Sequence, residues 1–517
     1  MKISLVQSPS WSVLTPPYSL ALLAAVLKKE GHEVFCFDFN SEVYRYAQRN
    51  KESVSWGTKG ESNSWQEGGY VQEFIRRNND FIEALVSEVL DTQAQIIGFS
   101  VQDTSVYFSE EISARIKQKD AKRVIIFGGP SCFRGSSFFH RFLDNTDIDA
   151  VCLKEGESAI LDFVSAFSSG SQVDYCPGFV SRGNTGQASD AGDVALREEL
   201  DSLPFADFSG FSLERYEEQT LPISTSRGCV NRCLFCAESA YWQKYRFRSA
   251  KNICAEMEFQ LKRHPHIGGF FFNDSLINGN ISMLDELSGM LIRKGLRIRW
   301  GGQAALRREM SLRFMKRLKK SGLSHVSYGL ESASPKILRL MGKGFDLKTA
   351  QEIIRNTHAL GIYTTVNIIV GFPGEGEREV LETADFLRRN IKFMDNIYFH
   401  LFVVSPGSYL YDYRNNFNIV LPDVNGPNLW YTQDGGNNYK IRLDRLNFYR
   451  SILNDKFATN ISLPNYYLVL GDNYFLAGDY GGALRFYEAA LDEGSGEANT
   501  SLVEDRIKEV NKKINVA

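Results

Sequence analysis

The chain has 517 residues, of which 43% are hydrophobic and 23% charged, a composition typical of globular proteins with sizeable cores. Its formal net charge of −3 gives no basic surface for a nucleic-acid backbone or an anionic membrane. The longest apolar run, Leu20–Leu27, is far shorter than the roughly 20 residues that cross a bilayer. We therefore expect a cytoplasmic protein with no nucleic-acid partner and no membrane span.

The first 170 residues alternate short apolar runs with amphipathic segments of helical length, which predicts a doubly wound, Rossmann-like parallel sheet. The expected strands are Lys2–Gln7, Glu33–Phe39, Gln95–Val101, Arg123–Phe127 and Ala150–Leu153. The expected helices are Tyr18–Lys29, Glu73–Leu90, Ser105–Lys119, Ser136–Leu143 and Ser158–Phe167. The polar segment Asn40–Gly69 is long for a connection, which indicates a functional or loosely ordered loop.

Residues 171–210 are rich in Ser, Gly, Asp and Asn, which predicts a linker. A second alternating series covers residues 211–410. Its expected strands are Leu221–Thr225, Gly269–Asn273, Ile298–Gln303, His325–Glu331, Tyr363–Val370 and Asn396–Val403. Successive strand–helix units of this kind predict a partial (β/α)6 barrel, whose active site lies at the carboxyl ends of the strands.

Residues 411–517 predict a mostly helical C-terminal domain. One segment matches the spacing of a single tetratricopeptide repeat, through Tyr467, Leu470, Gly471, Tyr474, Gly478, Ala483, Tyr487 and Ala490. A lone repeat does not bury its own apolar face. Two interpretations follow: a helix hairpin packed against the rest of the protein, or a surface that docks a peptide.

The segment Thr225-Ser-Arg-Gly-Cys229-Val-Asn-Arg-Cys233-Leu-Phe-Cys236 places three cysteines on one loop directly after a strand. In a four-iron cluster, three thiolates leave one iron without a protein ligand, so that this iron can bind the amino and carboxylate groups of a small molecule. The alternative is structural zinc, which takes four closed ligands, but no second cysteine pair exists to complete the set. His264 and His266 could complete it only from a polar helix end.

This CxxxCxxC loop resembles the radical S-adenosylmethionine (SAM) superfamily, and the likeness covers about residues 220–410. The resemblance implies that Cys229, Cys233 and Cys236 hold a [4Fe-4S] cluster and that SAM binds beside it. The positions that match SAM-binding motifs of the family are Phe235, Asn273, Asp274, Gln303, Glu331, Ser332 and Pro373. Gln303 stands where the family leads us to expect a basic residue, so the partner of the SAM carboxylate is left open.

The order of motifs in the first 170 residues resembles the cobalamin-binding domain that precedes many radical SAM cores. The resemblance implies cobalamin contacts from Pro17, Ser100, Gln102, Thr104, Gly128, Gly129, Glu155, Gly156 and Glu157. A plainer reading is that short glycine turns simply connect such a sheet. The loop Ser8–Trp11 lacks the Asp-x-His-x-x-Gly motif of cobalamin-dependent mutases, so no histidine is expected below the cobalt.

Together, the two resemblances imply a cobalamin-dependent methylase that uses SAM twice. One SAM methylates the cobalamin, and the other is split by the reduced cluster into methionine and a radical that takes hydrogen from an unactivated carbon. The implied acceptor is a carbon or phosphorus atom of a small-molecule or peptide substrate, and the implied electron donor is a flavodoxin or ferredoxin. Two alternatives stay open: a radical SAM cyclase, oxidase or rearrangement enzyme without net methyl transfer, and a non-catalytic cobalamin or iron–sulfur sensor.

Overall fold

The computed structural model describes the chain except residues 53–55, 57–61, 154, 171–175, 183–187, 191, 193–197, 423–428, 454–456, 460–466, 469–470, 472–473, 476–478, 493–495 and 515–517. The chain divides into two compact units. The first comprises residues 1–198, 202–218 and 461–517, and the second comprises residues 199–201 and 219–460.

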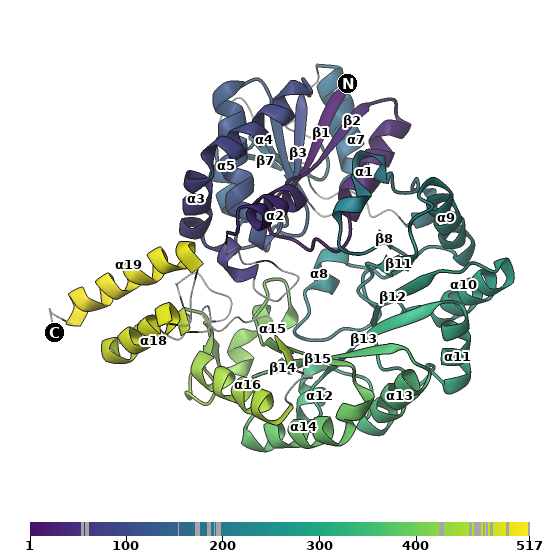
Figure 1. Cartoon of the computed structure of the whole chain (residues 1–517), viewed down its shortest axis with the longest axis vertical. Helices are drawn as coiled ribbons and strands as arrows, with labels where there is room; N and C mark the ends of the chain where they lie inside the picture. Colours follow the sequence, from purple (N-terminus) through teal and green to yellow (C-terminus); the bar gives the residue numbers. More distant parts are fainter. Residues whose placement is uncertain are drawn as a thin grey trace. The chain divides into compact units, whose positions relative to one another are not determined.

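The first unit is built on a seven-stranded sheet (Figure 1). Its strand order is β2 (Glu33–Asp38), β1 (Lys2–Gln7), β3 (Ile96–Ser100), β4 (Val124–Gly128), β5 (Ala150–Cys152), β6 (Phe179–Arg182) and β7 (Ala188–Asp190). Strands β1 to β5 are parallel, as the sequence predicts. The helices of this part are α1 (Tyr18–Lys29), α2 (Phe39–Arg49), α3 (Gly68–Arg77), α4 (Asn79–Asp91), α5 (Val106–Lys119), α6 (Phe139–Asp144) and α7 (Gly156–Ser168).

Three segments of this unit differ from expectation. The predicted linker supplies β6 and β7, which add antiparallel strands because buried Phe179 and Val180 pair with β5. The predicted loop after Phe39 begins with helix α2, whose first turn is capped by the Asp38 carboxylate accepting the Ser41 N–H. The single helix expected at Glu73–Leu90 is two helices, because the Asn78 side chain donates to the Phe74 carbonyl at 2.9 Å and ends α3.

The second unit contains a seven-stranded parallel sheet with helices along its outer side (Figure 1). The strand order is β8 (Thr220–Ile223), β11 (Gly269–Phe272), β12 (Arg299–Ala304), β13 (Leu323–Glu331), β14 (Tyr363–Val370), β15 (Asn396–Leu401) and β18 (Phe457–Thr459). The first six are the predicted barrel strands, and β18 adds one that the sequence did not predict. The covering helices are α9 (Ala250–Arg263), α10 (Ile281–Lys294), α11 (Leu312–Lys320), α12 (Pro335–Met341), α13 (Leu347–Ala359), α14 (Glu377–Asn390) and α16 (Tyr439–Leu453).

The two faces of this sheet differ in chemistry. On the helix side, the Tyr328 hydroxyl hydrogen-bonds Thr357 of α13, and the Phe399 ring stacks on Tyr449 of α16. On the opposite side, which we call the inner face, Asn367 of β14 donates to the Ser327 hydroxyl of β13 at 2.8 Å. Apolar residues of β13, β14 and β15 are buried toward the helices, while the alternating residues on the inner face are mostly polar.

The C-terminal hairpin consists of α18 (Tyr480–Asp492) and α19 (Gly496–Ile514), and it belongs to the first unit. A Cβ on Gly471 would lie 2.3 Å from the Tyr487 ring, so the backbone at Gly471 packs closely on this tyrosine of α18. The apolar contacts of the hairpin come from Leu468, Ala483, Tyr487, Ala490, Val503 and Val510. Leu470 and Gly478 of the predicted repeat lie outside the described residues, and docking of a peptide there stays a prediction.

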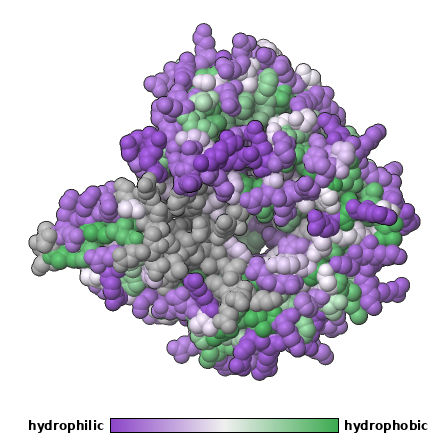
Figure 2. Space-filling model, viewed as in Figure 1, coloured by the Kyte–Doolittle hydropathy of each residue, from purple (hydrophilic) through white to green (hydrophobic). Residues whose placement is uncertain are grey.

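Most of the surface visible in Figure 2 is hydrophilic. Among the described residues, no helix is both long enough and apolar enough to span a membrane.

Candidate functional site

The cysteine loop follows β8 at the carboxyl end of the barrel sheet. Gly228 starts it with φ of +77°, and a Cβ there would lie 2.9 Å from the Lys244 carbonyl oxygen, so this position requires glycine. The Leu234 N–H donates to the Met341 carbonyl at 3.1 Å, which ties the loop to the end of α12. The three cysteines are half-buried, and each has a free thiol.

The electrostatics of the three thiols fit a polynuclear cluster. Burial raises the pKa of Cys229 and Cys233, and it raises the pKa of Cys236 to about 11. The charge of Cys229 adds to this effect at both of the other cysteines, so the three sulfur atoms are close enough to interact. Thiols with raised pKa values become thiolates only when a cation compensates the charge. Across the described part of the chain, no three Cys, His, Asp or Glu side chains, the loop cysteines included, are placed to hold a single metal ion.

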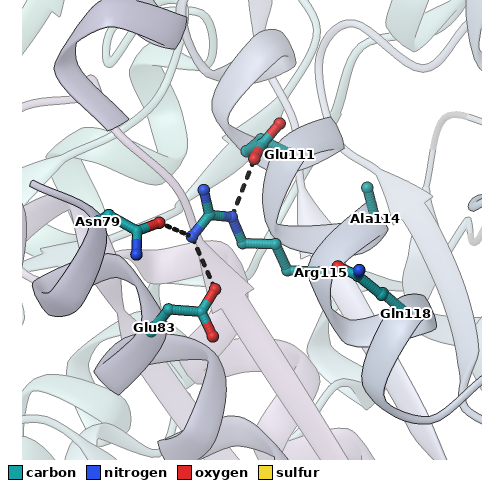
Figure 3. Close-up of a pocket in the computed structure, with 6 residues that line it drawn as sticks. All are labelled: Asn79, Glu83, Glu111, Ala114, Arg115 and Gln118. Carbon is teal, nitrogen blue, oxygen red and sulfur yellow. Dashed lines mark hydrogen bonds and ion pairs between the residues drawn. The ribbon is translucent and has the colours of Figure 1, made fainter. Parts of the chain in front are cut away.

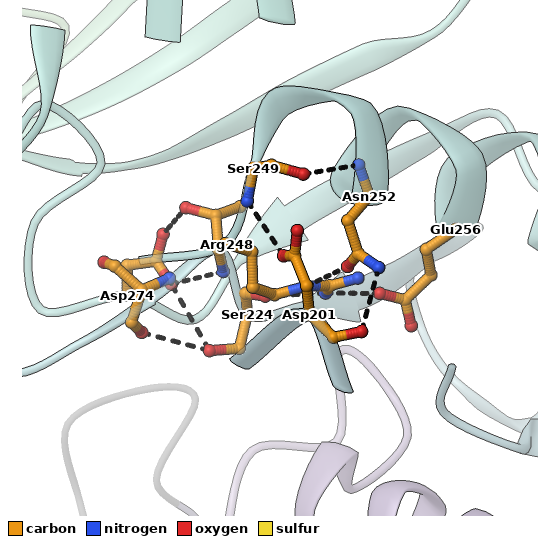
Figure 4. Close-up of polar contacts among 9 residues, drawn as sticks. Asp201, Ser224, Arg248, Ser249, Asn252, Glu256 and Asp274 are labelled. Atoms are coloured by element: carbon orange, nitrogen blue, oxygen red, sulfur yellow. Dashed lines mark hydrogen bonds and ion pairs between the residues drawn. The ribbon is translucent and has the colours of Figure 1, made fainter. Parts of the chain in front are cut away.

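Asp274, one of the predicted SAM-binding residues, holds the start of the cysteine loop. Its carboxylate accepts the Thr225 N–H at 2.7 Å, the Ser226 N–H at 2.9 Å and the Thr225 hydroxyl (Figure 4). Burial raises the pKa of Asp274 to about 6, although these hydrogen bonds favour its ionised form. The structure therefore places Asp274 as an anchor for the loop that carries the cysteines.

A buried ion pair supports the same loop from outside. Arg248 pairs with Glu256 of α9 and donates to the Ser224 carbonyl at 2.9 Å (Figure 4). The side chains of Arg248 and Glu256 are only 8% and 2% exposed, so neither charge could be removed alone without leaving the other buried and unpaired. Sequence reasoning missed this pair, since an Arg and a Glu eight residues apart carry no motif.

Two more predicted SAM-binding residues lie exposed at the carboxyl edge of the sheet. Asn273 follows β11, and Gln303 lies near the end of β12. The Gln303 backbone carbonyl accepts the Ile277 N–H at 2.8 Å, and its side chain is exposed. Their neighbour Ser275 hydrogen-bonds Glu238, which follows the cysteine loop.

Glu331 ends β13 in an unusual conformation. Its φ is +64°, in the left-handed region, where a β-bulge interrupts the register with β14. Its carboxylate pairs with Lys343 at 2.9 Å, and the ammonium of Lys343 lies 5.6 Å from the centroid of the Phe235 ring. A Cβ on Gly329 would lie 2.4 Å from the Glu331 carboxylate, so this glycine leaves room for the ion pair. Lys343 was missed because nothing in the sequence around it marks a site.

Ser332 and Pro373 are placed differently from each other. The Ser332 hydroxyl lies 3.2 Å from that of Thr383 on α14 and accepts the Ser334 N–H, so it is used within the fold. Pro373 lies in the turn after β14, beside Phe372, whose ring centroid is 6.4 Å from that of Phe235. This turn and the aromatic residue of the cysteine loop therefore come together, while contact of either with SAM stays a prediction.

In the first unit, the loops after β1 and β3 are joined at the carboxyl edge of the sheet. Gln102 and Thr104 both donate to the Ser10 carbonyl, at 2.8 and 2.6 Å. The hydroxyls of Ser8 and Ser10 are buried and have no hydrogen-bond partner within the described residues. Unsatisfied buried hydroxyls are costly unless a ligand completes them, so this edge fits a polar cofactor such as cobalamin.

The other predicted cobalamin-binding residues lie at the same carboxyl edge or at the helix ends that follow it. Register pairs place Gln7, Ser100 and Gly128 in one row across β1, β3 and β4. Gly129 has φ of +107° and lies so close to Val101 that a Cβ would be 2.9 Å from its nitrogen. Glu155, Gly156 and Glu157 form the start of α7, and Pro17 precedes α1.

A polar hollow lies between α4 and α5 of the first unit (Figure 3). Arg115 fills it and donates to Asn79 at 2.8 Å, to Glu83 at 2.7 Å and to Glu111 at 2.9 Å. Its guanidinium is thus satisfied by the protein, and the hollow is a salt-bridged helix contact.

Residues 223–387 match the sequence model of the Radical SAM superfamily. The chain is 24% identical to an uncharacterized methyltransferase of Pyrococcus horikoshii, over 81% of this chain and 84% of that protein. It is 26% identical to the anaerobic magnesium-protoporphyrin IX monomethyl ester cyclase of Rubrivivax gelatinosus, over 62% of this chain and 59% of the cyclase.

Two solved structures share the fold. The radical SAM methyltransferase TsrM of Kitasatospora setae, solved with cobalamin and a [4Fe-4S] cluster, superimposes with a TM-score of 0.61 and 18% identity, covering 82% of this chain and 78% of that one. The cobalamin-dependent radical enzyme OxsB, solved with aqua-cobalamin and SAM, gives a TM-score of 0.63 and 16% identity, covering 99% of this chain and 71% of that one. These similarities confirm the predicted fold class, which combines a Rossmann-like sheet, a partial barrel and a helical C-terminal region.

Proposed function

Because the chain belongs to the radical SAM superfamily, we propose that it is a cobalamin-dependent radical SAM methyltransferase acting on an unactivated carbon or a phosphorus of a small-molecule or peptide substrate. The observation that carries the proposal is the fold shared with TsrM over most of both chains, together with three cysteines on one loop after β8. The methyltransferase name of the Pyrococcus horikoshii relative also supports it.

In this proposal, Cys229, Cys233 and Cys236 hold the [4Fe-4S] cluster, and the carboxyl edge of the first unit holds cobalamin. Bound there, the cluster supplies the electron that splits SAM, and cobalamin supplies the carrier for the methyl group. Asp274 keeps the cysteine loop in place through three hydrogen bonds. The candidate SAM contacts are Phe235, Asn273, Asp274, Gln303, Glu331, Ser332 and Pro373, and an external flavodoxin or ferredoxin delivers the electron.

The decisive experiment uses anaerobically reconstituted full-length protein with methyl-deuterated SAM. A methyltransferase gives a product heavier by the labelled methyl group, together with 5′-deoxyadenosine. The similarity to the ester cyclase favours a second candidate, radical cyclisation or oxidation, which would release 5′-deoxyadenosine without transferring the label. If no 5′-deoxyadenosine is released under any reducing condition, both enzymatic functions fail and the sensor alternative gains support.

A matched pair of cysteine variants tests the cluster independently of turnover. Cys233→Ala is expected to abolish the iron content and the visible absorbance of the reconstituted protein. Cys254→Ala is the control, because Cys254 is buried on α9 and is not part of the loop. Iron retained in the first variant, or lost equally in both, would contradict the assignment.

A further inference from the structure

The inner face of the barrel sheet carries polar side chains that no SAM-binding motif explains. On β15, Tyr398 and His400 alternate with Ile397, Phe399 and Leu401, which are buried toward the helices. The register places Tyr398 beside Asn367 of β14. Parallel strands covered on both faces are usually apolar throughout, so polar residues at these positions need a partner that the sheet itself does not supply.

The two rings on β15 lie together and keep their polar atoms free. The centroids of Tyr398 and His400 are 4.6 Å apart. Within the described part of the chain, neither the phenol nor the imidazole makes a hydrogen bond to another residue, although both side chains are partly buried. Burial also lowers the pKa of His400, so the imidazole is neutral near pH 7 and offers one donor and one acceptor.

The charges around these rings indicate what kind of group they accept. At the inner-face positions of β13, β14 and β15 from His325 onward, the histidines are His325 and His400, and the one Asp, Glu, Lys or Arg side chain is Glu331. Its charge is matched by Lys343, and both side chains are about 12–13% exposed. No lysine or arginine without an acidic partner is therefore present at these positions to bind a phosphate or carboxylate, and a buried anion without a cation would be costly.

We propose that His400 and Tyr398 bind an uncharged hydroxyl, carbonyl or amide group of the substrate at the carboxyl end of β15. This inference rests on the proposed function, since it assigns the substrate to the inner face and leaves SAM to the loops after β8 to β14. His400 determines specificity: it hydrogen-bonds the neutral group, and it rejects analogues that carry an anion at the same place because no cation there would compensate the charge.

The test is a fragment screen by saturation-transfer NMR on the reconstituted full-length protein with SAM present, using equal numbers of neutral, anionic and cationic compounds. His400→Phe is expected to weaken a set of neutral hydroxyl or amide fragments by about five- to tenfold, the effect of losing one hydrogen bond. His400→Gln keeps a donor and an acceptor and should retain part of the binding. His358→Phe, on the outer helix α13, is the control and should leave these fragments unaffected.

The inference is overturned if no fragment depends on His400, or if the fragments that depend on it are mainly anions. Release of 5′-deoxyadenosine from SAM is measured in the same variants. If the wild-type protein releases no 5′-deoxyadenosine, the proposed function fails. The dependence of fragment binding on His400 is measured by NMR and does not require that release.

Discussion

The stability of the barrel should depend on pH through Asp274, because its carboxyl group is buried against the cysteine loop. Burial raises the pKa of Asp274 from its ordinary value of 3.8 to about 6. An acid whose folded-state pKa is raised contributes stability that is present below the unfolded pKa and lost as the pH rises through the folded pKa. The change of about two pKa units corresponds to roughly 3 kcal/mol in total, of which about half falls between pH 5 and pH 7.5.

Two substitutions separate the charge from the hydrogen bonds. Asp274→Asn can keep its oxygen toward the Thr225 and Ser226 N–H groups and donate from its amide to the Thr225 hydroxyl. We therefore expect it to fold with little loss and without the pH dependence. Asp274→Ala leaves two buried N–H groups unsatisfied, which costs about 2–6 kcal/mol.

The measurement is the free energy of unfolding in urea at several pH values between 5 and 7.5, for the wild type and both variants. The stability of the wild type relative to Asp274→Asn should fall by roughly 1–2 kcal/mol across this range. A constant difference between the two proteins, or one that grows in favour of the wild type as pH rises, would refute the argument that burial dominates the ionisation of this group.

Two further predictions concern the glycine turn after β14 and the ion pair between Lys343 and Glu331. Gly371→Ala puts a Cβ 2.2 Å from the Arg442 side chain at φ of +82°, so it should lower the free energy of unfolding by about 2–4 kcal/mol, whereas Gly435→Ala, at φ of +69° with nothing within 4 Å, should cost only about 1 kcal/mol of backbone strain. Equal effects of the two changes would mean that the contact with Arg442 is unimportant. Lys343→Met leaves Glu331 buried without its cation and should cost about 3–5 kcal/mol, and adding Glu331→Gln should recover part of the loss, as a thermal-unfolding double-mutant cycle would show. Additive losses would argue that the pair is not coupled.

The strands and the cysteine loop could be predicted from sequence because their signals are local. Short apolar runs separated by helix-length segments fix a parallel sheet, and three cysteines within eight residues directly after a strand need no long-range information. The residues that follow each strand could be assigned to one edge for the same reason, since parallel strands end together. The register confirms this for Gln7, Ser100 and Gly128.

What the sequence did not reveal depends on contacts between distant residues. Lys343 follows a helix end without any motif, and its relation to Phe235 exists only once the loop after β8 meets the end of α12. Strand β6 lies in a segment whose composition resembles a linker, because two apolar residues beside β5 suffice to add a short edge strand. The helix break at Asn78 likewise depends on one side-chain hydrogen bond within a continuous helical pattern.

The two sheets also differ in a property that the sequence already carries and that bears on function. In the first unit, β3 reads Ile-Ile-Gly-Phe-Ser and β4 reads Val-Ile-Ile-Phe-Gly, nearly continuous apolar runs of the kind expected for strands covered on both faces. In the second unit, β13 and β15 alternate polar with apolar residues, yet their sheet is parallel. Alternation in a parallel strand means that one face is not packed as a core. A ligand therefore meets the first sheet at its edge, where the loops are, while the second sheet offers an additional face that includes His400 and Tyr398.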